Sequence, residues 1–211
     1  MKIAFIGYGN VGGPLAIHLQ KLGHDVTLAS NDPVSESVAK VISRNPNINV
    51  SSPKTAVSEA EIVFLATPYG ANEAALTNVK EELSGKIIVD CTNPVGAGVS
   101  HGLNSEISGS EVIKNLIPAA DVVKAFTIYG YENFEDNSYP DYNVKPVMMF
   151  CGSSESAKGK VKELIEKLGW DALDVGGLNQ ALHLEHMTLM WVKMVRINGH
   201  NPNMVWGHLK R

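Results

Sequence analysis

The segment that most constrains this 211-residue chain is its start, which reads KIAFIGYGNVGGPLAIHLQKLGHDVTLASN over residues 2–31. Residues 2–6 form a short apolar run, and Gly7, Gly9 and Gly12 follow it at the spacing G-x-G-x-x-G. A helical pattern and then a second apolar run come directly after these glycines. A glycine turn can serve packing alone, but this order of strand, turn, helix and strand predicts a dinucleotide-binding unit.

Each glycine of the turn has a separate expected role. Gly7 permits the sharp turn, Gly9 lets a pyrophosphate lie against bare backbone, and Gly12 lets the helix approach the strand closely. The amides of Asn10, Val11 and Gly12 lie at the start of the helix, where the helix dipole also favours an anion. We therefore expect these residues to bind the pyrophosphate of a dinucleotide.

Strand and helix patterns alternate along the rest of the chain, which predicts an α/β fold: a Rossmann-type doubly wound parallel sheet with a small C-terminal αβ extension. We expect a dinucleotide-binding domain over residues 1–126 and the extension over residues 127–211, after a long loop at 129–146. Strands are expected at 25–29, 48–50, 62–66, 86–91, 122–126, 147–151 and 172–175, and helices at 33–43, 55–60, 72–83, 104–116, 155–168 and 179–197.

Composition narrows the classes of partner. The formal net charge of −4 gives no electrostatic footprint for nucleic acid or an anionic membrane. No apolar run is long enough to span a bilayer, and the first ten residues are too short for a signal peptide. Cys91 and Cys151 each close an apolar run, which favours buried reduced thiols and a cytoplasmic location. We expect a small-molecule partner.

Ligands of such sheets bind beyond the carboxyl ends of the strands. The segments expected there are rich in small polar residues, which can contact a ribose or a carboxamide without adding charge. Thr67, Pro68 and Tyr69 would place a hydroxyl and a ring beside the ribose and the nicotinamide, and Asn93 with Pro94 would face the carboxamide or the substrate.

The end of the second strand bears on the choice between NAD and NADP. An acidic residue there binds the ribose hydroxyls of NAD and repels a 2′-phosphate. This chain has the neutral pair Ser30 and Asn31, with Asp32 next to them, and Lys40 and Arg44 on the following helix. We favour NADP as the cofactor, with NAD as the alternative.

A clear acid–base pair is missing, so no catalytic residue is assigned. Lys124 lies inside a strand pattern, and Tyr69, Tyr129, Tyr131 and His101 are the other candidate proton donors. No metal is expected, because no third ligand accompanies the two histidines at 183 and 186. The last helix is apolar nearly all round, which predicts burial in the core or in a homodimer interface. Hydride transfer between two rings needs little acid–base help.

Five segments carry a resemblance to a known family. They are the IGYGNVG turn, Thr67-Pro68-Tyr69, VVKAFTIYGYENF at 122–134, PVMMFCGSSESAK at 146–158 and LDVGGLNQALHLEHMTLMWVKMVRINGH at 173–200. The chain resembles the NADPH-dependent reductases of the deazaflavin coenzyme F420 over nearly its whole length. The resemblance implies an NADP-dependent oxidoreductase that transfers hydride between NADPH and a flavin-like or deazaflavin acceptor.

The resemblance also implies roles for individual residues. Thr67 and Pro68 would lie against the nicotinamide ribose, Ser30 and Asn31 would meet the adenosine ribose or its phosphate, and Thr127, Ile128, Tyr129 and Gly130 would form part of the floor for the second ring. Asn31 stands where the family often has arginine, and Tyr131 would narrow the acceptor site.

Two alternatives stay open at this point: a non-catalytic module that senses NADP(H), and a reductase of small imines or carbonyls. The chain start is also similar to 3-hydroxyacid dehydrogenases and pyrroline-carboxylate reductases. Both have a large helical domain, whereas residues 127–211 have an αβ pattern. Membrane ferrireductases share a similar domain but need transmembrane helices.

Overall fold

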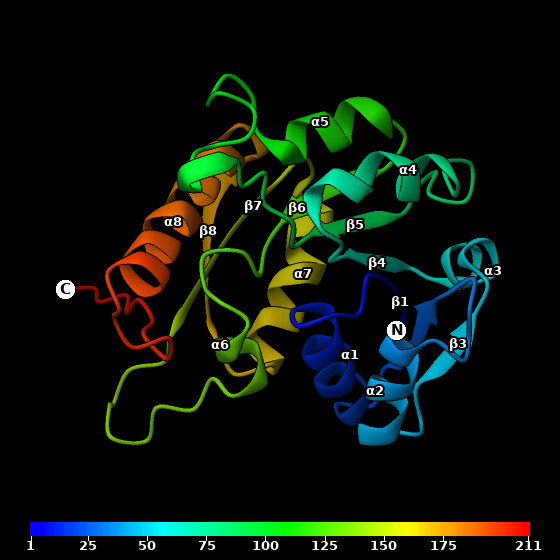
Figure 1. The fold of residues 1–211 in the computed structure, drawn as a ribbon, viewed down its shortest axis with the longest axis horizontal. Coiled ribbons are helices and arrows are strands. Elements are labelled where there is room, and N and C mark those ends of the chain that lie inside the picture. The colour runs from blue at the N-terminus through cyan, green and yellow to red at the C-terminus, as the bar shows by residue number, and fades with distance from the viewer.

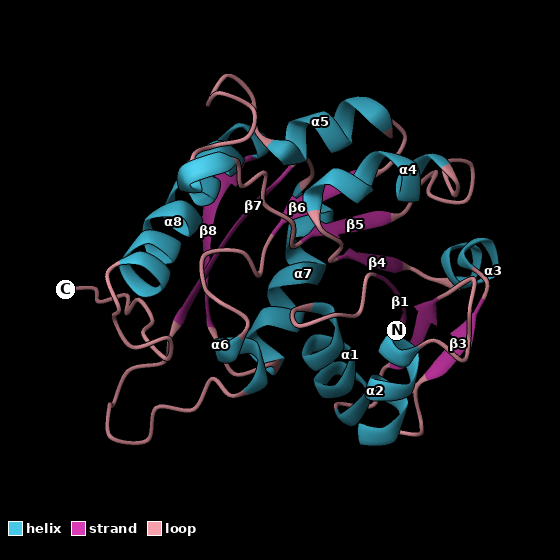
Figure 2. Cartoon of the chain, viewed as in Figure 1, coloured by secondary structure: helices cyan, strands magenta, loops and turns pink.

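The computed structural model describes residues 1–211 and has one eight-stranded sheet with helices on both faces (Figures 1 and 2). The strand order is β3-β2-β1-β4-β5-β6-β7-β8. The strands are β1 (Lys2–Ile6), β2 (Asp25–Ala29), β3 (Asn49–Ser51), β4 (Ile62–Leu65), β5 (Ile87–Asp90), β6 (Asp121–Lys124), β7 (Val147–Gly152) and β8 (Asp171–Gly177). The chain order reverses between β1 and β4, which is where doubly wound sheets bind their ligands.

The helices follow the predicted alternation. They are α1 (Gly12–Lys21), α2 (Glu36–Arg44), α3 (Pro53–Glu59), α4 (Asn72–Thr77), α5 (Gly109–Leu116), α6 (Glu132–Glu135), α7 (Glu155–Lys167) and α8 (Ala181–Val192), with short 3₁₀ segments at Tyr69–Ala71, Ala97–Val99 and Leu178–Gln180 and a π-helical turn at Lys193–Ile197. The α/β class predicted from the sequence is confirmed.

The sheet differs from an all-parallel one in the direction of two strands. Strands β1 to β6 are parallel, whereas β7 runs antiparallel to β6, with Lys124 opposite Cys151, and β8 is parallel to β7. A strand parallel to β6 would need a crossover that returns the chain to the end of the sheet at which β6 begins. Residues 125–146 contain only the single turn of α6 and no such crossover, so β7 starts near the carboxyl end of β6.

Two helix boundaries also differ. Helix α4 ends at Thr77, short of the predicted residue 83. Helix α5 begins at Gly109, not at residue 104, because Asn104 and Ser105 adopt positive φ angles of 55° and 60°. Ser108 then caps the helix in a capping box with Glu111.

One face of the last helix is buried in the core and another is left uncovered by this chain, so burial in a homodimer interface stays a prediction. Trp191 and Leu184 on α8 are buried, but the Met190 side chain is 46% exposed and Ile197 in the following turn is 67% exposed. The apolar pattern of α8 and the following turn therefore includes residues on a face that no other part of this chain covers.

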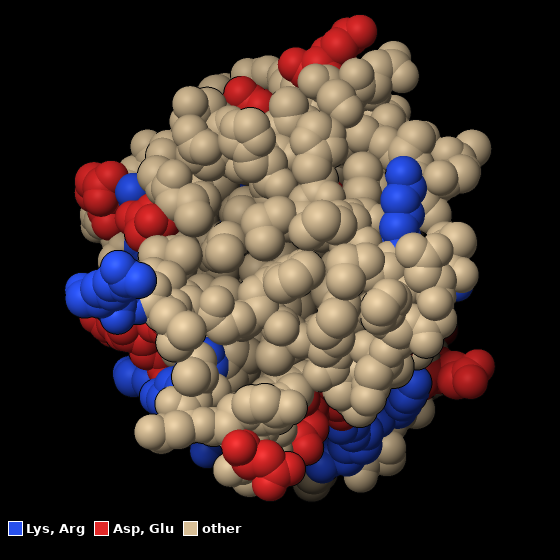
Figure 3. Space-filling model, turned by 90° about the vertical axis from the view of Figure 1, so that its left-hand side faces the viewer, with Lys and Arg blue, Asp and Glu red and all other residues tan.

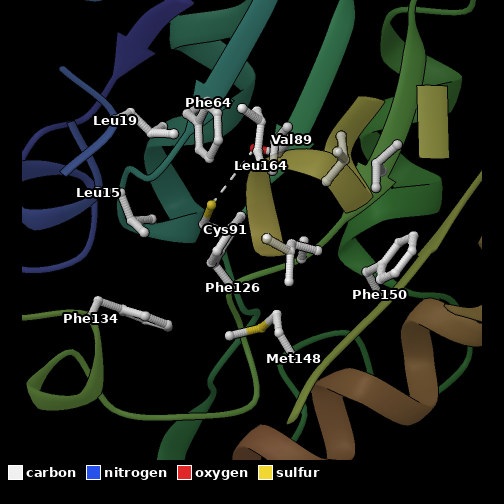
Figure 4. Packing of buried hydrophobic residues seen from close by; sticks show 14 of the residues in the cluster. Leu15, Leu19, Phe64, Val89, Cys91, Phe126, Phe134, Met148, Phe150 and Leu164 are labelled. Atoms are coloured by element: carbon white, nitrogen blue, oxygen red, sulfur yellow. Dashed lines mark hydrogen bonds between the residues drawn. The ribbon is translucent and has the colours of Figure 1, made fainter. Parts of the chain in front are cut away.

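The core joins the two segments that the sequence distinguished. Phe5 and Phe64 stack with ring centroids 4.7 Å apart. The same cluster includes Phe134 and Met148 from beyond residue 126 (Figure 4). Residues 127–211 therefore extend the sheet and the core of residues 1–126. The cysteines are free and buried, and no helix of the chain is long and apolar enough to cross a bilayer.

Candidate functional site

At two glycines of the turn a side chain would collide with backbone atoms, and at the third it would meet empty space. A Cβ atom on Gly7, whose φ is +88°, would lie 2.6 Å from the backbone of Ala66 and Thr67, and one on Gly12 would lie 2.1 Å from the Gly7 carbonyl oxygen. A Cβ atom on Gly9 would meet no atom within 4 Å. Gly7 and Gly12 therefore serve close packing, and Gly9 exposes backbone to open space beside the start of α1.

That open space belongs to a cavity of about 520 Å³. Cavities that bind small ligands typically measure about 300–1,000 Å³. The cavity lies between the glycine turn, the end of β2 and the start of α4. Its lining includes Gly7, Gly9, Asn31, Thr67 and Asn78, and no lining residue is charged. Helix α1 begins without a side-chain cap and without an acidic residue in its first turn. The residues present therefore fit an elongated dinucleotide with its diphosphate at the helix start.

The two residues predicted at the end of β2 are placed differently. Ser30 is buried, and its Oγ atom donates to the carbonyl oxygen of Asp32 and accepts from the Asp32 amide. Asn31 lines the cavity. Arg44, one of the two basic residues of α2 considered for a phosphate clamp, donates two hydrogen bonds to Glu135 of α6, which keeps the pKa of that carboxyl lowered. Of Ser30 and Asn31, only Asn31 therefore lines the cavity.

A chain of hydrogen bonds links the ends of β4 and β5. The Thr67 hydroxyl donates to Asn72 Oδ1 at 2.6 Å, and Asn72 Nδ2 donates to Thr92 Oγ1 at 2.8 Å. Asn72 is buried at the start of α4, and the sequence reasoning missed it. Thr67 lines the cavity, and with its proton committed to Asn72 its hydroxyl oxygen can only accept a hydrogen bond from a ligand.

Tyr69 lies apart from the main cavity. Its ring packs where a Cβ atom on Gly109 would stand, 2.7 Å from Tyr69 Cε2, and it lines a separate cavity of about 260 Å³ between α4 and α5. Burial, followed by the charges of Glu185 and Asp90, raises the pKa of the Tyr69 hydroxyl. The structure does not bring Pro68 into the lining of either cavity.

The ends of β5 and β6 are joined to α8. The Thr127 hydroxyl donates to Asn93 Oδ1 at 2.6 Å, and the Thr188 hydroxyl donates to the Thr127 carbonyl oxygen at 2.8 Å. This leaves the Asn93 amide nitrogen free to donate. Phe126 turns the chain between β6 and Thr127 with a φ of +54°, a strained angle for a bulky residue that its tight packing holds.

The segment predicted as the floor of an acceptor site is mostly buried. Thr127, Ile128 and Tyr129 are 1%, 0% and 4% exposed. The Tyr129 hydroxyl donates to the carbonyl oxygen of Val147, and burial raises its pKa. Gly130 has no room for a side chain, since a Cβ atom there would lie 2.2 Å from Trp191. Only backbone of this segment, at Gly130, is available to a ligand.

The candidate proton donors differ in burial and in whether their polar atoms are already hydrogen-bonded. His101 is buried, with Nε2 bonded to Glu185 and Nδ1 accepting two backbone amides. Tyr129 is committed to Val147 as described. Tyr131 is 41% exposed and lies beneath the guanidinium of Arg196. No group of three His, Cys, Asp or Glu side chains is arranged to hold a metal ion.

The structure assembles a buried charged cluster that the sequence reasoning did not identify. Lys124 at the end of β6 donates to Asp90 Oδ2 at 3.0 Å and to Glu185 Oε1 at 2.9 Å. Burial alone lowers the pKa of Lys124, but the two carboxylates outweigh it and raise that pKa. The available signal was a charged residue at the end of each of two short strands, Asp90 in IIVD and Lys124 in DVVK.

Comparison with known proteins agrees with this geometry. Residues 2–94 match the family described as NADP oxidoreductase, coenzyme F420-dependent. The F420-dependent NADP reductase of Methanocaldococcus jannaschii is 28% identical over 202 residues, which cover 89% of each chain. The metalloreductase STEAP3 of Rattus norvegicus is 29% identical over 189 residues, and the match spans 89% of this chain but only 36% of that protein.

A solved structure extends the likeness to three dimensions. A protein of Arthrobacter sp. FB24, provisionally named an F420-dependent NADP-reductase, superposes with a TM-score of 0.88 at 28% identity and covers 100% of both chains. The resemblance predicted from the sequence is thereby confirmed. The chain is an oxidoreductase related to the F420-dependent NADP reductases along nearly its whole length.

Proposed function

We propose that this chain transfers hydride between NADPH and a flavin-like or deazaflavin ring, such as that of coenzyme F420. The observation that carries the proposal is a neutral cavity at a glycine turn, at the ends of β1, β2 and β4. The ionisable groups at the ends of the next strands of the sheet, β5 and β6, are buried and paired. Two rings held in contact carry out such a transfer themselves, so the protein needs only to bind and orient them. NAD in place of NADP stays an alternative.

The proposed roles follow the placement of the residues. Gly7, Gly9, Asn10, Val11 and Gly12 would bind the diphosphate at the start of α1. Asn31 would meet the adenosine ribose, Thr67 would accept a hydrogen bond from the nicotinamide ribose, and the free amide nitrogen of Asn93 would donate to the carboxamide.

The acceptor side of the site is proposed for the C-terminal segment. Residues 127–211 provide Gly130, the aromatic side chain of Tyr131 and helix α8 beside Asn93. We retain the division at residue 126 as a functional one, although sheet and core are continuous across it.

Rapid-mixing measurements of NADPH absorbance test the proposal. The full chain is mixed with NADPH and, separately, with a deazaflavin, an ordinary flavin and a ferric chelate. We expect NADPH oxidation with a ring acceptor. Tight binding of NADPH with no oxidation by any of these acceptors would instead favour a module that senses NADP(H).

Reduction of a small imine or carbonyl is disfavoured, because it needs a proton donor in the site. His101 and Tyr129 are buried with their polar atoms committed to the protein, which leaves Tyr131, 41% exposed, as the one of these three candidates that could donate a proton.

Replacing Asn31 by Arg is expected to raise the preference for NADPH over NADH by roughly tenfold. A guanidinium forms charge-assisted hydrogen bonds to a phosphate, which contribute about 1.5–3 kcal/mol each. The Asn31 side chain lines the cavity, and the nearby Arg44 is bound to Glu135. Dissociation constants of both dinucleotides measure the effect, with Asn31→Gln as the neutral control. An equal change for NADPH and NADH would contradict the placement of Asn31 beside the 2′-position.

We further propose a homodimer in the cytoplasm. Figure 3 turns towards the viewer the side of the molecule that carries α8 and the C-terminus in Figure 1, and the charged side chains gather at its rim while the centre is free of them. Met190, Ile197 and Leu209 are 46%, 67% and 79% exposed. Sedimentation of the full chain tests the dimer, and the free buried cysteines support a reducing compartment.

A further inference from the structure

Four ionisable side chains from distant parts of the chain meet beneath the carboxyl ends of β5 and β6. Asp90, Lys124 and Glu185 have side chains that are 0%, 0% and 1% exposed, and that of His101 is 2% exposed. Glu185 comes from α8 and His101 from the loop before α5. Buried charges of this kind are costly unless they are paired and hydrogen-bonded.

Every polar atom of the cluster is satisfied. The three ammonium protons of Lys124 go to Asp90, Glu185 and the carbonyl oxygen of Thr92. Asp90 also accepts from the amide and hydroxyl of Thr92 and from Ser110. Glu185 also accepts from the Gly109 amide and from His101. The cluster is therefore a rigid unit with no free donor or acceptor.

The hydrogen bonds fix His101 in its neutral form. Its Nδ1 atom accepts from the amides of Leu103 at 3.3 Å and Ser105 at 3.1 Å, so that atom carries no proton. The ring proton lies on Nε2, which donates to Glu185 Oε2 at 2.8 Å. The exposed ring of His186 packs edge-on against His101 and bonds to the Ser105 hydroxyl. One lysine and two carboxylates then give the cluster a net charge of −1.

The cluster adjoins the residues assigned to the nicotinamide. The amide, hydroxyl and carbonyl groups of Thr92 all bond to Asp90 or Lys124, and the next residue is Asn93. Thr188, one helical turn after Glu185, bonds to Thr127, which holds the Asn93 side chain. At Tyr69, beside the same strand ends, the pKa is raised by burial and then by Glu185 and Asp90, against an opposing effect of Lys124. The potential that the cluster sets up there is negative.

We propose that the cluster of Asp90, Lys124, Glu185 and His101 favours the oxidised, positively charged nicotinamide over the reduced, neutral one, and so promotes hydride donation. The inference rests on the proposed function. When the hydride leaves NADPH with its electron pair, the ring gains a positive charge. A fixed negative charge in a water-excluded site stabilises that charge as it develops. Lys124 and Glu185 act through Thr92 and Asn93 as positioning residues.

Neutralising one carboxylate tests the charge. In Glu185→Gln the cluster loses its net charge but keeps an oxygen for Lys124 or Gly109. We expect the dissociation constant of NADP⁺ to rise on the order of tenfold while that of NADPH changes little. The interaction energy of two unit charges roughly 10 Å apart, at an effective dielectric constant of about 20, corresponds to a change in affinity of about that size. Fluorescence titration of the full chain measures both constants.

Two further variants keep the test decisive. Asp90→Asn makes the same charge change at a second position and serves if Glu185→Gln does not fold. Glu166→Gln, on the exposed face of α7 beside Lys162, removes a carboxylate outside the cluster and should alter neither constant.

The ratio of the two dissociation constants separates the explanations. If the role of the cluster were merely structural, the variant would bind NADP⁺ and NADPH more weakly by the same factor. The ratio would then be unchanged, and that result would overturn the inference. If the unmodified chain bound neither dinucleotide, the proposed function itself would fail. Hydride transfer to a deazaflavin with an unchanged ratio would leave the proposed function standing and refute the inference alone.

Discussion

Replacing Lys124 by Met is expected to lower the free energy of unfolding by about 3–5 kcal/mol, the usual cost of removing one partner from a buried ion pair. The variant leaves the Asp90 and Glu185 carboxylates buried without their cation, although both keep their other donors. Methionine has a similar volume, so lost charge and not lost packing dominates the effect. Denaturant unfolding monitored by circular dichroism gives the free energy.

An exposed lysine provides the matched control. Lys162→Met removes a pair with Glu166 on α7, whose side chains are 47% and 50% exposed, and should cost less than about 1 kcal/mol. Combining Lys124→Met with Glu185→Gln should cost less than the sum of the two single changes, because the second change removes one of the uncompensated charges. If Lys124→Met unfolded at the same denaturant concentration as the unmodified chain, the cluster would not be paired as described.

Local signals predicted the first half of the fold well. The glycine turn, the two flanking strands and α1 lie where the spacing of Gly7, Gly9 and Gly12 placed them, because each of these features is decided within a few neighbouring residues. The antiparallel direction of β7 and β8 was not predicted, for the opposite reason. It depends on whether the chain crosses back over the sheet, and an aperiodic segment such as 129–146 contains no signal for that.

The site shows the same division between local and distant contacts. Gly9, Asn31 and Thr67 line the cavity, and each belongs to a strand-end segment that composition alone identified. The charged cluster joins positions 34 and 61 residues apart, and Lys124 read in isolation is only a polar residue in a strand. Asn72 and Thr188 escaped notice because their patterns are those of ordinary helix residues, and only packing brings them to the strand ends.

Replacing Gly9 by Ala is expected to weaken dinucleotide binding by roughly tenfold to hundredfold without changing the stability of the fold. The added methyl group would meet no protein atom within 4 Å, so the folded chain can accept it. It would, however, occupy the space in which the diphosphate approaches the backbone. Overpacking of one methyl group costs about 1–3 kcal/mol, which corresponds to that range of affinity.

Two other glycine changes make the result specific. In Gly12→Ala the new Cβ atom would lie 2.1 Å from the Gly7 carbonyl oxygen, so helix α1 must move and both stability and binding should fall. In Gly159→Ala, on α7, the Cβ atom also meets nothing within 4 Å, and binding should be unchanged. Calorimetric titration with NADPH and thermal unfolding of the three variants separate the two effects. Unaltered affinity in a stable Gly9→Ala variant would mean that the diphosphate does not lie against this turn, since the added Cβ atom points into the space that the diphosphate is proposed to occupy.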